Sequence, residues 1–421
     1  MDRRFFNMFP GLTEERAIEL LTMPLDQMED ASDRYIAASH LVNFPTERSI
    51  AALISALEDQ NQELYHRIAR RKAVETLGRL KATTGLSAIR ACLVEDDIYT
   101  VENAVWAIGE IGTTDEEILE EITQLLQKPN HTHRVIIHVL AKLGYRAALE
   151  RIAPLMELED PTIASAAISA YSRFSGDRSK MEQVVEFLQH SNVNVRRACI
   201  QDLMDANYYE AIPKIAICPV SMVFRMRGIR HLAENARSSG ALKFEDVEPT
   251  LDRVIRDRAE DLELVHEYDQ TPALEFAIGE LYQTDFGRCY LGSKTLLDLY
   301  ANAASPALMA TFAEKAHNDY GAHYHVVKLL GRLKYAPAYD LLVEALHNRA
   351  PQFQKSRTAA AIALGDLGDE RAIPELKASL ETGLWELKYA ALMALETFGD
   401  DSGRALCAND PDWAIAAKSQ S

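Results

Sequence analysis

Apolar residues recur along this chain with the period of an α-helix. In the segment 97–112, for example, Ala104, Ile108 and Ile111 stand at positions i, i+4 and i+7, which places them on one face of a helix. No stretch shows with comparable strength the alternation of apolar and polar residues that indicates a β-strand. The pattern therefore predicts an all-α protein.

The helical pattern repeats at a nearly constant interval. Each copy contains Ala-x-x-x-large-small, and the small position recurs every 31 or 32 residues in a first array and after 34 and 31 residues in a second. Repeats of this length are typical of solenoids in which each helix pair packs against its neighbours. Small residues here would let adjacent helices approach closely. The positions are Gly78, Gly109, Ala141, Ser172 and Met204, then Gly331, Gly365 and Glu396.

Interruptions of the repeat divide the chain into five parts. Residues 1–60 are an N-terminal leader with one degenerate repeat, 61–217 a first array, 218–320 an irregular helical insert, 321–399 a second array and 400–421 a polar tail, expected to be frayed. The predicted architecture is a curved α-solenoid with an irregular insert between two arrays. Clefts at such junctions are common ligand sites.

Composition and charge narrow the classes of function. The chain has 421 residues, 48% of them hydrophobic, and a formal net charge of −18, which disfavours nucleic acid because DNA and RNA require a basic face. No apolar run approaches the roughly 18 residues of a membrane span, and the N-terminus lacks a secretory signal core. The five cysteines are scattered without a C-x-x-C pair, which favours a reducing, cytoplasmic location with buried thiols.

One copy breaks the charge pattern of the repeat. In aligned copies the same position holds Arg71, Glu102, Arg134 and Arg196. Glu102 could form a ladder of ion pairs with the arginines of neighbouring copies, which would add little stability. Alternatively, it is a functional carboxylate on the concave face, because Tyr99, Asn103 and Trp106 share its side of the helix.

A second group of candidates occupies the corresponding position of the second array, Tyr324. Together with Tyr320, His323 and His325 it crowds aromatic and titratable side chains into the start of a helix, ahead of the apolar face that begins at Val326. Aromatic residues at helical spacing usually belong to a core, but titratable groups at the ends of elements are often functional. Several of these side chains are therefore expected to face the groove.

A cluster of arginines lies in the insert. Arg225, Arg227 and Arg230 stand close together in an otherwise acidic chain. They could pair with nearby carboxylates at the surface, or they could hold the carboxylates of a ligand, because arginine binds such groups in a bidentate manner.

Metal and nucleotide chemistry have little support in the sequence. His131 and His133 stand two positions apart, on different faces of a helix, and no cysteine or carboxylate nearby completes a ligand set. No phosphate loop, G-x-S-x-G motif or dinucleotide fingerprint occurs. No metal and no permanently bound cofactor are expected.

Three segments together resemble the E/F-type phycobilin lyases, which are HEAT-like repeat proteins of organisms with phycobilisomes. They are the segment from Asp97 to Trp106 with its Tyr-x-Val-Glu-Asn-x-x-Trp core, the segment 133–137, and the stretch from Pro219 to Arg227. The resemblance covers most of residues 60–400 and implies a solenoid of HEAT-like helix pairs. The length of the chain is similar to that of the single-chain phycoerythrin lyases and lyase-isomerases.

The resemblance also implies a reaction. The chain would bind an open-chain tetrapyrrole, phycoerythrobilin, as substrate, and a phycoerythrin subunit as acceptor. A cysteine thiol of the acceptor would add to the ring A ethylidene group and form a thioether. A lyase-isomerase would also shift a double bond to give phycourobilin. The Asn-His-Cys motif of one isomerase subunit is matched only partly, by Asn130-His131-Thr132, so this motif does not indicate isomerase activity.

The candidate residues can be given roles in that reaction. Tyr320 or Tyr324 would donate or relay a proton, and Glu102 would pair with pyrrole N–H groups or share the acid role. Two aromatic residues would stack on the bilin, and arginines would hold its propionates. The residues expected to bind the bilin are Tyr99, Asn103, Trp106, Arg134, Arg225, Arg227 and His323.

Two other functions stay open from the sequence. Repeat arrays are mostly binding scaffolds, so the chain could be a non-enzymatic adaptor whose concave face binds a partner helix. It could also be a bilin chaperone, which would bind pigment without transferring it.

Overall fold

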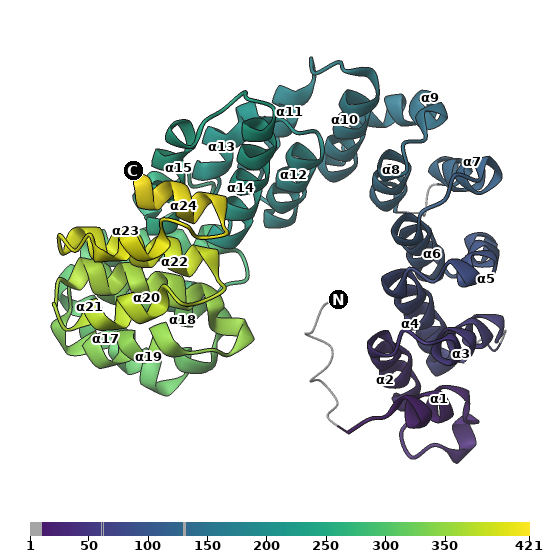
Figure 1. The fold of residues 1–421 in the computed structure, drawn as a ribbon, viewed down its shortest axis with the longest axis horizontal. Coiled ribbons are helices and arrows are strands. Elements are labelled where there is room, and N and C mark those ends of the chain that lie inside the picture. The colour runs from purple at the N-terminus through teal and green to yellow at the C-terminus, as the bar shows by residue number, and fades with distance from the viewer. Residues whose placement is uncertain (1–10, 60, 62, 129–131) are drawn as a thin grey trace. The chain divides into compact units, whose positions relative to one another are not determined.

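The computed structural model describes residues 11–59, 61, 63–128 and 132–421, and every regular element in this part of the chain is a helix (Figure 1). The all-α prediction is confirmed. The chain forms two compact units, Met1–Ser179 and Lys180–Ser421. The boundary between them lies inside the predicted first array. Among the described residues, no helix combines the length and apolar character that a membrane crossing requires.

The first unit consists of two rows of helices. Consecutive members of one row pack against each other: α2 (Asp33–His40), α4 (Leu64–Leu80), α6 (Ile98–Ile111), α8 (His133–Lys142) and α10 (Pro161–Ser175). The other row contains α1 (Glu14–Thr22), α3 (Glu47–Glu58), α5 (Leu86–Ala91), α7 (Glu116–Gln124) and α9 (Leu149–Ile152). The apolar faces of both rows form one continuous core.

The small residues of the repeat allow this packing, as predicted. A Cβ atom at Gly78 would lie 2.8 Å from the Cα atom of Ala107 in the next layer, closer than real Cβ atoms approach. In the second unit Gly331 meets the backbone of Ala363 in the same way. The recurring small position therefore marks where successive helices of a row touch.

The second unit continues the helix pairs and contains the predicted insert. The helices before the second array are α11 (Met181–Glu186), α12 (Val193–Asp205), α13 (Ile212–Ile217), α14 (Met222–Ser238), α15 (Phe244–Arg256), α16 (Leu274–Gly279) and α17 (Phe286–Glu314). Helix α17 is kinked at Tyr300, where φ is −127° and ψ is 20°, and the same helix contains Pro306. Residues 262–273 contain no helix.

The second array and the C-terminal region complete this unit. Its helices are α18 (Tyr320–Arg332), α19 (Tyr339–His347), α20 (Gln354–Leu367), α21 (Ala372–Ser379), α22 (Trp385–Thr397), α23 (Ser402–Cys407) and α24 (Trp413–Gln420). Helices α18, α20 and α22 pack side by side. The tail is not frayed as expected, because Ala414 and Ile415 of α24 are fully buried against the unit.

Candidate functional site

The predicted site on α6 forms an accessible stripe. Tyr99 is exposed, and Glu102, Asn103 and Trp106 are partly exposed, whereas the neighbouring positions Ala104 and Val105 are buried. Spacings of three and four residues place side chains on one side of a helix. The structure confirms that the four predicted residues share one accessible face.

Arg71 of α4 holds the first turn of α6. Its guanidinium donates two hydrogen bonds of 2.6 Å to the carboxylate of Asp97 and lies 4.6 Å from the centre of the Tyr99 ring. The side-chain amide of Asn103 donates a hydrogen bond of 3.1 Å to the backbone carbonyl of Arg71. Burial raises the pKa of Asp97, but hydrogen bonds from Arg71 and Thr100 prevail and lower it to about 2. Tyr99 and Asn103 are thus held by the preceding layer.

Glu102 is not the ion-pair partner of Arg71. Its carboxylate accepts a hydrogen bond of 2.7 Å from the hydroxyl of Thr132. Arg134 donates a hydrogen bond of 2.8 Å to the backbone carbonyl of Thr162 in the next layer. The alternative of an ion-pair ladder from Arg71 through Glu102 to Arg134 is therefore wrong, because Arg71 pairs with Asp97 and not with Glu102. The Glu102 carboxylate stays partly exposed on the stripe.

Trp106 completes the stripe. A Cβ atom at Gly78 would lie 2.9 Å from the indole ring, so the ring is seated against α4 where that helix has no side chain. The guanidinium of Arg79 lies 5.8 Å from the centre of the indole ring. The indole therefore presents a fixed, partly exposed aromatic surface beside Glu102 and Asn103.

Only Tyr320 of the second predicted group is well exposed. Its exposed fraction is 52%, whereas that of Tyr324 is 1% and that of His323 is 3%. The expectation that several of these side chains face a groove is wrong. Helix α18 packs against α17, α19 and α20, so every residue from Gly321 to Gly331 is buried.

His323 is a core histidine and not a bilin ligand. Its ring stacks on that of Phe353, with ring centres 4.3 Å apart and planes inclined by 22°. Burial lowers the pKa of His323 to about 4, so the ring is neutral at physiological pH. The same burial keeps the ring away from a ligand in solution.

Tyr324 belongs to a buried network centred on Asp257, the residue directly after α15. The Asp257 carboxylate accepts hydrogen bonds from the hydroxyls of Tyr324 and Tyr290, the latter at 2.9 Å. The ammonium of Lys328 donates to the same carboxylate at 2.8 Å, and the guanidinium of Arg225 forms an ion pair with it. One carboxylate thus connects α14, α17 and α18.

Burial and pairing shift the titration of this network in opposite directions. Burial alone would raise the pKa of Asp257, but the charges of Lys328 and Arg225 hold it below its usual value. Burial, followed by the charge of Asp257, raises the pKa of Tyr324 well above its usual value. The Tyr324 hydroxyl is therefore a fixed donor to a carboxylate and not an acid available to a ligand.

Arg225 cannot hold the carboxylates of a ligand, contrary to the prediction. It is 1% exposed, and its guanidinium is occupied by Asp257 and by the backbone carbonyls of Ala216 and Val220. Arg230 forms an ion pair of 2.7 Å with Asp412, which agrees with the alternative that these arginines pair with nearby carboxylates. Of the three arginines only Arg227 is exposed.

No sequence pattern indicated a role for Lys355, near the start of α20. The residue is 5% exposed, and within the described part of the chain its ammonium nitrogen has no hydrogen-bond partner. That nitrogen lies 3.3 Å from the ring centre of Tyr320, 4.1 Å from that of Phe286 and 5.2 Å from that of Tyr324. Burial lowers the pKa of Lys355 to about 7. The amine lies against the face of the Tyr320 ring, and no hydrogen bond joins it to the Tyr320 hydroxyl.

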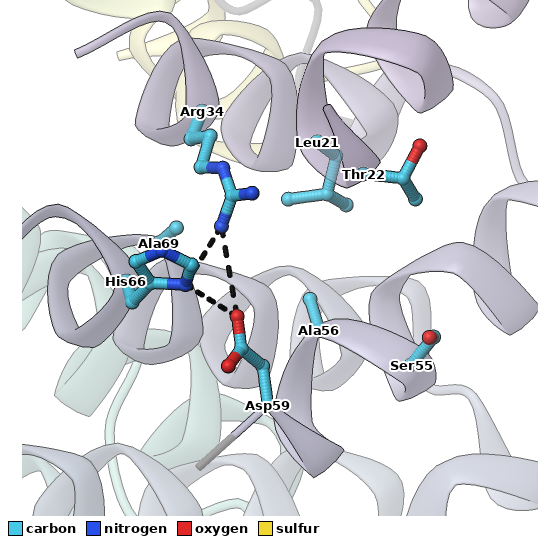
Figure 2. A pocket seen from close by; sticks show the side chains of 8 residues that line it. All are labelled: Leu21, Thr22, Arg34, Ser55, Ala56, Asp59, His66 and Ala69. Carbon is cyan, nitrogen blue, oxygen red and sulfur yellow. Dashed lines mark hydrogen bonds and ion pairs between the residues drawn. The ribbon is translucent and has the colours of Figure 1, made fainter. Parts of the chain in front are cut away.

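A small cavity of about 150 Å³ in the first unit is lined by a polar cluster (Figure 2). The guanidinium of Arg34 lies 2.8 Å from the Nδ1 atom of His66 and 3.6 Å from the carboxylate of Asp59. His66 also contacts Asp59 through the same ring nitrogen. These side chains satisfy one another, which is the ordinary condition of buried polar groups.

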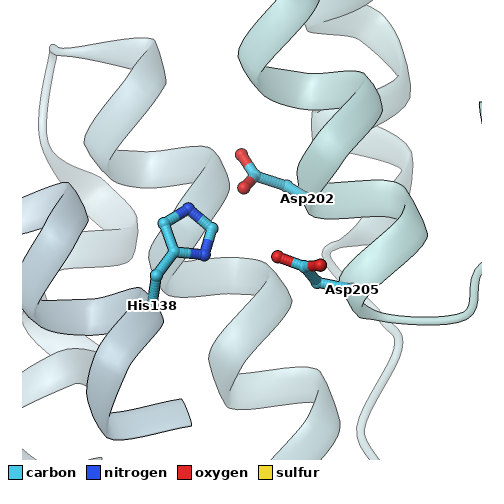
Figure 3. A group of neighbouring side chains, drawn as sticks. All are labelled: His138, Asp202 and Asp205. Atoms are coloured by element: carbon cyan, nitrogen blue, oxygen red, sulfur yellow. The ribbon is translucent and has the colours of Figure 1, made fainter. Parts of the chain in front are cut away.

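Two aspartates stand near the end of α12, and Figure 3 shows both carboxylates on the same side of this helix. Asp202 is fully buried, and Asp205 accepts a hydrogen bond of 2.8 Å from the side chain of Gln201. Asn130 and His131 lie outside the described residues. His133 begins α8, and its Nε2 atom lies 3.2 Å from the backbone carbonyl oxygen of Lys128.

None of the five cysteines forms a disulfide, and all are buried, as expected from their spacing. Burial raises the pKa of Cys92, Cys218 and Cys289 to about 12. A thiol acts as a nucleophile in its deprotonated form. These side chains are therefore structural.

Residues 305–396 match the family described as HEAT repeats, and residues 33–59 match the PBS lyase HEAT-like repeat. The chain is 56% identical over 421 residues to the "Uncharacterized phycocyanin operon protein Y" of Pseudanabaena tenuis (strain PCC 7409), and the alignment covers 100% of both chains. It is 33% identical over 387 residues to the "Bilin biosynthesis protein CpeY" of Synechococcus sp. (strain WH8020), covering 89% of this chain and 91% of the relative. It is 28% identical over 254 residues to the "Phycocyanobilin lyase subunit alpha" of Nostoc sp. (strain PCC 7120 / SAG 25.82 / UTEX 2576). This alignment covers 56% of this chain and 90% of the relative. The chain therefore belongs to the E/F-type family of phycobilin lyases, which are built from HEAT-like repeats.

Proposed function

We propose that this chain is a phycobilin lyase that attaches phycoerythrobilin to a cysteine of a phycoerythrin subunit through a thioether. The names of two relatives, a bilin biosynthesis protein and a phycocyanobilin lyase subunit, support bilin attachment as the general reaction. The name of the full-length relative points to a phycocyanin operon, so a phycocyanin subunit is the second acceptor to test.

The observation that supports the proposal most directly is that all five of the chain's own thiols are buried. For three of them burial raises the pKa to about 12, so the attacking sulfur has to come from the acceptor. In the proposed step this sulfur bonds to the ethylidene carbon, the thiol loses its proton, and a proton is delivered to the conjugated system. The addition changes no oxidation state, so the bilin is the substrate and no further cofactor is needed.

In the second unit, Tyr320 and Lys355 are suited to the proton transfer. Tyr320 is exposed, and the ammonium of Lys355 lies against the inner side of its ring. An acid or base with a pKa near the working pH is the most effective proton carrier. Of the two tyrosines predicted as proton donors, only Tyr320 stays a candidate, because Tyr324 is buried and its hydroxyl donates to Asp257.

In the first unit, the stripe on α6 offers surfaces that fit a tetrapyrrole. Tyr99 and Trp106 provide accessible rings for stacking, and Glu102 provides a carboxylate for the pyrrole N–H groups. Asn103 adds an amide on the same face. The exposed Arg227 and the partly exposed Arg134 stay as further candidate contacts to the bilin.

We also propose that the chain isomerises the attached bilin to phycourobilin. This isomerisation requires that a proton be removed at one carbon of the bilin and returned at another, which a residue pair such as Tyr320 and Lys355 can perform. The absorbance of the attached pigment decides this point, because phycourobilin absorbs to the blue of phycoerythrobilin.

The test is co-expression of the chain with a phycoerythrobilin-producing system and, in separate cultures, each acceptor subunit. A lyase gives an acceptor that keeps its colour after denaturation, and an acceptor without its cysteine stays colourless. Pigment that stays on the chain and is never transferred would indicate a chaperone. A colourless chain and a colourless acceptor would indicate an adaptor, and either result would overturn the proposal.

A further inference from the structure

A polar pocket of about 540 Å³ lies in the second unit, on the side where α20 and α22 begin. Pockets for small molecules range from about 300 to 1,000 Å³, so its volume suits a ligand of that class. Its walls are the ends of α19 and α21, the starts of α20 and α22, and the turns between them. The residues that line it include His347, Arg349, Gln354, Arg357, Glu381 and Thr382.

Two arginines in this pocket, the exposed Arg349 and the half-buried Arg357, have no ion-pair partner among the described residues. In that part of the chain, the single side-chain hydrogen bond of Arg357 goes to the backbone carbonyl of Leu346 at 2.8 Å. Burial, and then the charge of Arg349, lower the pKa of Arg357.

The other side chains of the pocket do not neutralise this pair. His347 is engaged by Glu375 at 2.6 Å, outside the pocket lining. Glu381 is an exposed carboxylate of the lining and makes no ion pair among the residues that the structure describes. Neither α20 nor α22 has a side-chain cap at its N-terminus, so the free backbone N–H groups add to the positive potential.

Carboxylates are available to pair with arginines in this chain. Acidic side chains outnumber basic ones, 63 to 45. The fully buried arginines of the same unit, Arg196 and Arg225, each have a carboxylate partner, whereas the half-buried Arg197 and Arg258 form no ion pair among the described residues. Two neighbouring guanidinium groups without a carboxylate partner, at the wall of a pocket, are the arrangement expected for an anionic ligand.

We propose that this pocket binds the propionate carboxylates of the bilin, with Arg349 and Arg357 as their ion-pair partners. This inference rests on the proposed function and gives the propionates a site in place of the buried Arg225. Guanidinium groups bind carboxylates through paired N–H donors, and two of them suit a ligand with two carboxylates. Gln354, which also lines the pocket, adds an amide that can donate a hydrogen bond to a carboxylate.

The test compares phycoerythrobilin with its dimethyl ester, in which both propionates are neutral. Each pigment is titrated into the full-length chain, and binding is followed by the change in absorbance. The unaltered chain is expected to bind the diacid about tenfold more tightly than the ester, because the ester cannot form charge-assisted hydrogen bonds. The double variant Arg349→Gln, Arg357→Gln is expected to bind both pigments with nearly the same affinity.

Arg371→Gln is the matched control. Arg371 lies in the same unit, is exposed, and pairs with Asp369 away from the pocket, so this variant should keep the tenfold preference. Equal binding of diacid and ester by the unaltered chain would overturn the inference while leaving the proposed function intact. A preference that persists in the double variant would also overturn it. If neither pigment binds, the proposed function itself fails.

Discussion

The ammonium nitrogen of Lys355 lies 3.3 Å from the centre of the Tyr320 ring, so a nearly buried amine is covered by a half-exposed tyrosine. Phe286 closes the site from another side at 4.1 Å. Aromatic faces stabilise an ammonium, whereas burial favours the neutral amine. Burial prevails over the nearby negative charges and brings the pKa of Lys355 to about 7.

Lys355→Met is expected to change how stability depends on pH. Above pH 7 the folded chain has lost a proton that the unfolded chain keeps up to about pH 10.5, so Lys355 makes stability rise with pH in that window, by about 1 kcal/mol per pH unit. The variant should lack this rise in urea unfolding between pH 7 and 9. The groups that act on Lys355 are Cys289, Asp257, Asp319 and Lys328.

Lys315→Met is the control for that experiment. Lys315 is exposed, and its ammonium lies 4.5 Å from the ring centre of Tyr282. Its removal should leave the slope of stability against pH unchanged. If Lys355→Met also leaves the slope unchanged, Lys355 is charged throughout and is not suited to proton transfer near neutral pH.

Tyr320→Phe and Tyr324→Phe should have opposite consequences. Loss of the Tyr324 hydroxyl removes a hydrogen bond to the charged Asp257 and should cost about 1.5 to 3 kcal/mol of unfolding free energy. Loss of the exposed Tyr320 hydroxyl should change stability by less than about 0.5 kcal/mol. It should slow thioether formation about tenfold or more without loss of bilin binding. Unfolding curves and single-turnover ligation measure the two effects, and unchanged ligation in Tyr320→Phe would exclude this tyrosine.

Asp257→Asn should destabilise the second unit strongly. Asparagine tolerates the left-handed backbone at this position, where φ is 49°, so the substitution tests the charge and not the turn. It leaves Arg225 and Lys328 buried without their carboxylate, which should cost about 3 to 5 kcal/mol in denaturant unfolding. Asp412→Asn, which removes the partly exposed partner of Arg230, should cost less than about 1 kcal/mol. Equal effects of the two changes would contradict the network.

Gly331→Ala should destabilise the chain although alanine favours helices. The added Cβ would overlap the backbone of Ala363 in the next layer, and overpacking of this kind costs about 1 to 3 kcal/mol. Gly383→Ala, at a position with no atom within 4 Å of the added Cβ, should be nearly neutral. Thermal unfolding of the two variants compares them, and a neutral Gly331→Ala would mean that the helices of the row can separate.

Glu102→Gln should reduce ligation without loss of stability. Glutamine can still accept the hydrogen bond from Thr132 but has no charge with which to pair with pyrrole N–H groups or exchange a proton. We expect a decrease of about tenfold or more in the rate of ligation. Glu110→Gln, on the same helix and paired with Lys142 at 2.7 Å, should have no such effect. If Glu102→Gln ligates at the normal rate, Glu102 has only a structural role.

The local pattern of the sequence was sufficient to predict the helices and the residues that form the stripe on α6. The spacing of the small residues predicted where Gly78 and Gly331 meet the next layer, because each repeat packs against its immediate neighbours. That Tyr99, Glu102, Asn103 and Trp106 share one face followed from helical geometry alone. These features depend only on residues close in sequence or one repeat apart.

The sequence alone therefore determined the all-α repeat architecture, the close helix contacts and the stripe on α6. Only the tertiary structure decided that Tyr324 and Arg225 are buried around Asp257, that Lys355 lies beneath Tyr320, and that Arg349 and Arg357 share a pocket. For Tyr324 and Arg225 the physical reason is that the insert brings α15 and α17 against α14 and α18, so these side chains meet partners far away in the sequence. Arg349 and Arg357 share a pocket because the turns after α19 and α21 pack side by side. A helical period gives the direction of a side chain on its own helix, but it does not show whether another helix covers that side.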